Sequence, residues 1–114
     1  MRWIDVVEIA LKWPEVAEGT SYGEPSLKVR KRLLTRVRLK DDSLVLLDIP
    51  SEERDILIAA TPQTFFTEEH YRDYDIVLAR LENISAREVA AFLERRWRSS
   101  ATKRAVAEFD RGLV

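Results

Sequence analysis

Residues 26–49, SLKVRKRLLTRVRLKDDSLVLLDI, carry the pattern that decides the fold of this 114-residue chain. Apolar and polar residues alternate over 26–30 and 33–39, and residues 44–49 form a nearly continuous apolar run. Alternation with a period of two is typical of strands with one buried face, and the apolar run suits a more fully buried strand. Because the connections are short, with a turn at Asp41-Asp42, we expect three adjacent antiparallel strands.

The segment before these strands predicts one helix and one loop. Apolar side chains recur at helical spacing over residues 2–12, which indicates an amphipathic helix that Pro14 ends. Residues 14–25 are rich in Gly, Pro, Ser and Thr, and this composition favours a loop.

The segment after these strands completes an α+β pattern. Ser51 is a candidate N-cap, and Ser85 with Glu88 forms a capping box. The expected elements are a helix over 52–60, a strand over 76–81 with 64–70 as a less certain neighbour, and helices over 86–98 and 102–110. The whole chain, 1–114, is therefore expected to form one α+β domain, an antiparallel sheet flanked by helices on one face.

Composition narrows the classes of function. The chain has no Cys, so a disulfide, a thiolate metal site and a catalytic Cys are excluded. Charged residues interrupt the N-terminal apolar stretch, and no apolar run approaches the roughly 20 residues needed to cross a bilayer. No phosphate-cradling Gly-rich motif occurs. These features predict a cytoplasmic protein without a membrane partner, and a single His without any Cys predicts no metal site. The sequence reveals no reaction, so we do not expect an enzyme.

Positive charge is concentrated between residues 28 and 40, which hold seven basic side chains and no acidic one. They are Lys28, Arg30, Lys31, Arg32, Arg36, Arg38 and Lys40. The remaining chain has twelve basic residues against twenty acidic ones, a net charge of −8. A concentrated basic patch is the usual footprint of an anionic partner, so we expect DNA or another polyanion.

Strand register decides whether this patch forms. A two-residue loop at Lys31-Arg32 would place charged side chains among core residues. A longer loop, which we predict, or a bulge would instead keep the basic side chains on one face of the sheet and the apolar side chains on the other. Either alternative would gather Lys28, Arg30, Arg36, Arg38 and Lys40 on the outer face of the sheet, with Arg80 a candidate for the same face. Leu34 breaks the alternation and is expected to face outward or lie in the bulge. The simpler alternative is that these cations only keep an exposed face hydrated, or that carboxylates such as Asp48 neutralise them.

Two stretches resemble a known family. Residues 19–29, GTSYGEPSLKV, and residues 61–66, TPQTFF, followed by 69–74, EHYRDY, resemble the signature of the MmcQ/YjbR-like family. The resemblance covers about residues 3–104 and implies a bacterial protein with a frataxin-like fold, often labelled DNA-binding. It also implies a binding surface made by the sheet and its loops, with no cofactor. The chain departs from that pattern at Lys31-Arg32, Leu34 and Asp75-Ile76.

A cluster of aromatic residues predicts a possible pocket. His70 is the only histidine, and it lies in sequence beside Tyr71, Arg72 and Tyr74 near the expected sheet edge. Together with Tyr22 of the Gly-rich loop, these residues could serve a small-ligand binder or an enzyme. A structural role for His70 is the simpler alternative. Residues 19–23, GTSYG, match the G-x-S-x-G pattern, but the strand before and the helix after it are lacking.

The sequence therefore leads to one preferred function and two alternatives. We expect a bacterial DNA-binding or anion-binding module that uses the basic sheet face. The alternatives are a protein-interaction module that docks an acidic partner and a small-ligand binder around Tyr22 and His70. A second basic cluster at 95–104 is more simply explained by cations near a helix C-terminus.

Overall fold

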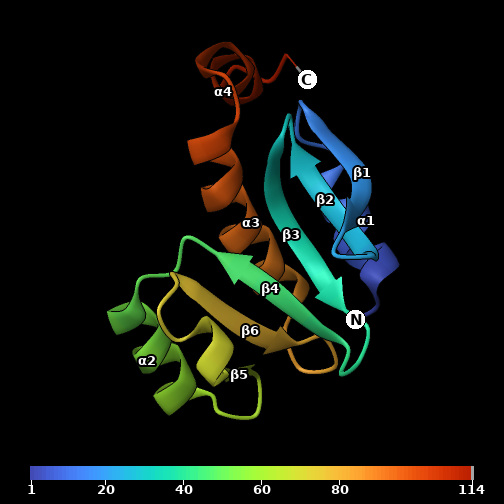
Figure 1. Ribbon diagram of the computed structural model, residues 1–114. Coiled ribbons are helices and arrows are strands. Elements are labelled where there is room, and N and C mark those ends of the chain that lie inside the picture. The colour runs from blue at the N-terminus through green and yellow to red at the C-terminus, as the bar shows by residue number, and fades with distance from the viewer. Residues whose placement is uncertain (114) are drawn as a thin grey trace.

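The computed structural model describes residues 1–113 and contains a six-stranded sheet with the order β1-β2-β3-β4-β6-β5 (Figure 1). The strands are β1 (Val16–Ser21), β2 (Glu24–Val29), β3 (Arg32–Arg38), β4 (Ser43–Leu47), β5 (Phe65–Phe66) and β6 (Ile76–Arg80). Every neighbouring pair is antiparallel. The prediction of an α+β fold with an antiparallel sheet is confirmed.

Four α-helices and one 3₁₀ helix accompany the sheet. They are α1 (Trp3–Ala10), α2 (Ser51–Ala60), the 3₁₀ helix η1 (Glu69–Tyr71), α3 (Ala86–Ser100) and α4 (Lys103–Asp110). The capping box of Ser85 and Glu88 is present at the start of α3. Helix α2 instead begins directly after Pro50 without a side-chain cap, so the prediction of Ser51 as N-cap is wrong. Within residues 1–113, no helix is long and apolar enough to span a membrane.

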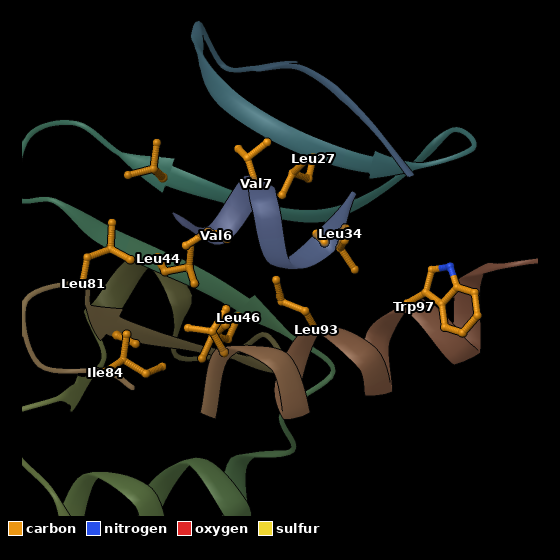
Figure 2. Close-up of a cluster of buried hydrophobic side chains, with 14 of the residues drawn as sticks. Val6, Val7, Leu27, Leu34, Leu44, Leu46, Leu81, Ile84, Leu93 and Trp97 are labelled. Atoms are coloured by element: carbon orange, nitrogen blue, oxygen red, sulfur yellow. The ribbon is translucent and has the colours of Figure 1, made fainter. Parts of the chain in front are cut away.

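The main core lies between the sheet and helices α1 and α3. Figure 2 shows Val6 and Val7 of α1, Leu93 of α3, and Leu44 and Leu46 of β4 in one cluster of buried side chains. All five side chains are at most 3% exposed. Burying a leucine or valine side chain contributes about 1.5–3 kcal/mol, so this layer supplies most of the hydrophobic stabilisation.

Strand β1 was not expected, and the prediction of a loop over 14–25 is wrong. Residues 16–21 pair with β2 through a two-residue turn at Tyr22-Gly23. Both turn residues have positive φ, 54° and 76°, as a type I′ hairpin turn requires. Because β1 is an edge strand exposed along most of its length, it lacks the apolar alternation that reveals strands in a sequence.

A bulge in β3 sets the register of the basic hairpin formed by β2 and β3. Val29 pairs with Arg32 across a two-residue loop, so the prediction of a longer loop is wrong. The register then shifts beyond the pair Lys28–Leu33, and this shift places Leu34 in a bulge. Leu34 is fully buried in the main core, which agrees with its expected place in a bulge and excludes the outward alternative.

The second face of the sheet, called the outer face here, is partly covered by the segment that contains η1. Its strand residues include Ser26, Lys28, Leu33, Arg36, Arg38, Ser43, Val45, Leu47, Phe66, Ile76, Leu78 and Arg80, as the strand register places them. Tyr71 of η1 packs on Val45 and Leu78 and forms a small second cluster. The outer face is therefore only partly hydrated, contrary to the expectation of a bare basic surface.

Candidate functional site

The two central arginines of the basic segment lie on the outer face but are buried. Arg36 is 8% exposed and Arg38 is 4% exposed. A guanidinium removed from water needs hydrogen-bonded partners, and both residues have carboxylate partners. The expectation that Arg36 and Arg38 are open to a phosphate backbone is therefore wrong for this structure.

Arg38 is the centre of a charged network. It donates hydrogen bonds to Asp41, to Glu68 (2.6 Å) and to the Ser43 hydroxyl (3.1 Å). Burial by itself would raise the pKa of Asp41, but the hydrogen bonds from Arg38 and Ser43 outweigh it and lower that pKa. The hydrogen bond from Arg38 also lowers the pKa of Glu68. Both carboxylates are therefore ionised at neutral pH and compensate the charge of Arg38.

Arg36 is enclosed by a carboxylate and two tyrosines. Its Nη1 donates to Glu24 Oε1 (2.7 Å), and its Nη2 donates to the hydroxyl of Tyr71 (2.6 Å). The Tyr22 ring lies over the guanidinium at 5.2 Å from its centroid. Glu24 also accepts from the backbone N–H of Leu39 at 2.7 Å. This arrangement fixes Arg36 between the turn at Tyr22 and the 3₁₀ helix.

The remaining basic residues do not form one patch on the outer face. Lys28 is half-buried on that face, whereas Arg30 and Lys31 occupy the exposed turn between β2 and β3. Arg32 lies on the helix side, where its Nη1 donates to the Ser99 carbonyl at the end of α3 (3.2 Å). The prediction that Arg30 joins the outer face is therefore wrong.

Two further basic residues lie at the margins of the outer face. Lys40 is exposed in the turn after β3, with its Nζ 3.9 Å from Glu68. Arg80 is on the outer face, as expected, and its guanidinium stacks on the Phe66 ring at 4.2 Å from the centroid. It also donates to the Pro62 carbonyl at 3.4 Å. Of these two, Lys40 has the more exposed charge.

A cavity of about 460 Å³, called the outer-face cavity here, lies beside Arg36. Its lining residues are Tyr22, Leu33, Arg36, Val45, Leu47, His70, Tyr71, Tyr74 and Ile76. The floor is apolar and comes from β3, β4 and β6, while the walls are aromatic. A concave, mostly apolar site with a few polar groups is the usual form of a small-molecule site.

Three local features build this cavity. The turn at Tyr22-Gly23 carries the Tyr22 ring to its rim, where the side chain stays 88% exposed. The bulge at Leu34 leaves Leu33 on the outer face as part of the floor. Buried Arg54 of α2 donates to the carbonyls of Arg72 (3.0 Å) and Tyr74 (3.3 Å), which ties down the wall.

The structure brings together most of the residues expected to form a pocket. Tyr22, His70, Tyr71 and Tyr74 all line the outer-face cavity. Arg72 does not line it and instead offers its backbone carbonyl to Arg54. The apolar floor and the place of Arg36 beside it are two features that the predicted pocket did not include. The signal available was the nearly unbroken apolar run of β4, which implies an apolar side chain on both faces.

The comparisons give no further assignment. No family model matches the chain, and no curated protein or solved structure matches it either. The resemblance to the MmcQ/YjbR-like family therefore stays a prediction. Among residues 1–113, no three histidine, cysteine or acidic side chains are grouped so that they could hold a metal ion.

Proposed function

We propose that this protein binds a small molecule with an apolar, aromatic body in the outer-face cavity. The observation that carries the proposal is the pair of exposed tyrosines above an apolar floor. Tyr22 is 88% exposed and Tyr74 is 59% exposed, although both line the cavity. Rings left open to water beside an apolar hollow gain stabilisation when a ligand covers them.

The fixed position of the walls supports the same proposal. Tyr71 is held by its hydrogen bond from Arg36, and its ring meets the His70 ring edge to face at a centroid distance of 4.9 Å. The backbone at Tyr74 is held by Arg54. A cavity whose walls are already held in place loses little entropy on binding, which favours affinity for a small ligand.

NMR shift mapping with indole as the probe tests this function. We expect millimolar indole to shift the resonances of Leu33, Leu47 and Tyr74, as weak affinity is typical of a ligand with few atoms. The variant Leu47→Trp, which fills the floor, should abolish these shifts. The matched variant Ile56→Trp adds the same ring on the exposed face of α2 and should leave them unchanged.

Shifts that persist in Leu47→Trp, or that fall outside the lining residues, would contradict the proposal. The two-dimensional spectrum of each variant also reports whether it is folded. A folded Leu47→Trp protein that still shows the full indole response would move the binding site elsewhere.

A second candidate function is DNA binding at the end of the molecule where the basic hairpin meets α4. Arg32 donates to Ser99, and Glu15 joins the two regions, because its backbone carbonyl accepts from the N–H of Arg30 (3.1 Å). Its carboxylate accepts from the backbone and hydroxyl of Thr102, each at 2.9 Å. Figure 1 shows the β2–β3 turn and α4 at the same end.

Charge at this end favours the second candidate. Within residues 1–113, Lys28, Arg30, Lys31 and Arg32 make no ion pair, unlike Arg36 and Arg38. Lys103 at the start of α4 is exposed and adds to them. An acidic protein partner remains an alternative ligand for the same cations. The family resemblance favours DNA.

A salt titration with labelled duplex DNA tests the second candidate. We expect micromolar or weaker affinity that falls steeply with salt, and a clear loss in the variant Lys31→Glu. Arg72→Glu, an equal charge reversal at an exposed residue beside the outer-face cavity, should cost much less. Equal losses in both variants, or no binding at low salt, would contradict it.

We also propose which fold family the domain belongs to. We infer a frataxin-like, MmcQ/YjbR-like domain from the sequence resemblance. The six-stranded antiparallel sheet, with α1 and α3 on one face, supports this inference.

A further inference from the structure

A second hollow of about 330 Å³ adjoins the outer-face cavity. The two share Tyr22, Arg36, His70 and Tyr71 as lining residues, so they lie side by side on the outer face and are together called the joined site here. The lining that belongs to the second hollow alone is Glu24, Arg38, Lys40 and Glu68. The joined site is therefore apolar at one end and charged at the other.

The charged end is balanced rather than basic. Arg36, Arg38 and Lys40 contribute three positive charges, while Glu24 and Glu68 contribute two negative ones. Asp41 hydrogen-bonds to Arg38 beside the hollow and supplies a third carboxylate. A ligand end of one sign would meet groups of its own sign here, and such contacts disfavour binding.

Donors and acceptors remain within reach of a ligand. Lys40 is 68% exposed at its side chain, and its nearest carboxylate, in Glu68, is 3.9 Å away. The hydroxyl of Tyr71 accepts from Arg36, and its own hydrogen has no acceptor among residues 1–113. The side chains of Glu24 and Glu68 are 23% and 40% exposed. Each of their oxygens accepts a hydrogen bond within the protein and keeps a further lone pair for a cationic group.

We propose that the joined site binds an aromatic molecule whose polar end carries both a cationic and an anionic group. This is the chemistry of an aromatic α-amino acid. The aromatic body occupies the outer-face cavity between the tyrosines. The ammonium group meets Glu24 and Glu68, and the carboxylate meets Lys40 and Tyr71. This inference rests on the proposed function and adds the chemistry of the ligand's polar end.

Four probes that share one indole body test the inference by NMR titration. They are indole, tryptamine, indole-3-propionate and tryptophan, which carry no charge, a positive charge, a negative charge and both charges. We expect tryptophan to bind tightest, by about threefold or more over each of the others, as the modest strength of exposed ion pairs implies.

Two variants identify the groups that recognise the polar end. Lys40→Met should remove the advantage of tryptophan over tryptamine, because the partner of the carboxylate is lost. Glu68→Gln should remove the advantage of tryptophan over indole-3-propionate, because a partner of the ammonium is lost. Gln keeps an oxygen that can accept from Arg38, and the spectrum of each variant reports its folding.

The outcomes separate this inference from the proposed function. Equal affinity for all four probes, with shifts at the cavity residues, would overturn the inference and leave the proposed function standing. Tightest binding of indole-3-propionate or tryptamine would also overturn it. No response to any probe would overturn both.

Discussion

The two faces of the sheet use different means to bury their side chains. The inner face packs against α1 and α3 in a cluster of nineteen buried apolar residues. Among residues 1–113, the outer face has only three such residues, Val45, Tyr71 and Leu78, and it buries two arginines beside them. The inner face therefore supplies most of the fold's stability, while the outer face keeps hollows that a packed core would fill.

Buried arginines are an expensive way to cover a sheet. A guanidinium must be compensated by carboxylates and hydrogen bonds, and a well-packed apolar residue often stabilises as well or better. Arg36 and Arg38 nevertheless occupy adjacent outward positions of the central strand β3 and line the second hollow. This is the pattern expected where a surface is shaped for binding, because stability alone does not require it.

Neighbouring leucines of β4 give the sharpest test of this difference between the faces. Leu46 is fully buried on the inner face, and Leu47 is half-buried at the outer-face cavity. We expect Leu46→Ala to lower the free energy of unfolding by about 3 kcal/mol, since it leaves a void in a tight core. Leu47→Ala should cost about 1 kcal/mol or less. Urea unfolding of both variants measures the two values.

Equal costs for the two leucines would contradict the proposed difference. They would show that the outer face is packed as tightly as the inner one and contributes as much to stability. The denaturant slope must be unchanged in both variants for the comparison to hold.

The network around Arg38 should have the next largest effect. We expect Arg38→Met to lower the free energy of unfolding by about 2 kcal/mol, because charge-assisted hydrogen bonds to Asp41 and Glu68 are lost. Lys40→Met, two residues away and exposed, should change stability by no more than about 0.5 kcal/mol. Thermal or urea unfolding distinguishes them.

An unchanged free energy of unfolding in Arg38→Met would contradict this prediction and show that Arg38 does not stabilise the fold.

The sequence predicts the elements of the sheet better than its edges. The strands β2, β3, β4 and β6 follow from apolar pattern, since each has a face in the main core. Strand β1 contributes only Val16 at the margin of that core, and its residues 16–21 are mostly exposed. The turn at Tyr22-Gly23 is the available signal, but Tyr is not typical at a position with positive φ.

The candidate site shows what a one-dimensional pattern leaves out. Alternation correctly placed Arg36 and Arg38 on the outer face. Their burial depends on Glu24, Asp41 and Glu68, and Glu68 is thirty residues from Arg38 in the chain. Spacing alone does not reveal such a partner, so the run of basic residues predicts an exposed patch that the structure does not contain. The aromatic walls at 70–74 could be predicted from the sequence because their residues are adjacent in the chain.

The smallest expected effect is a pH dependence of the free energy of unfolding that arises from the outer face. The pKa values of Asp41 and Glu68 are lowered in the folded protein, so folding is favoured while both are ionised. This contribution is complete above the ordinary pKa of about 4 and is lost as pH falls through the lower folded values. We expect Glu68→Gln to remove about 1 kcal/mol or less at pH 7, since Glu68 is partly exposed, and almost nothing near pH 2.

Urea unfolding of the wild type and Glu68→Gln between pH 7 and pH 2 measures how their difference in stability falls as the pH is lowered. Asp110 provides the control, because its pKa is lowered by hydrogen bonds from Arg98 on the exposed surface between α3 and α4. Asp110→Asn should show a smaller difference over the same range, since water and salt screen that pair. A larger effect for Asp110→Asn would place the acid-sensitive ion pairs at the helices and refute the outer face as their location.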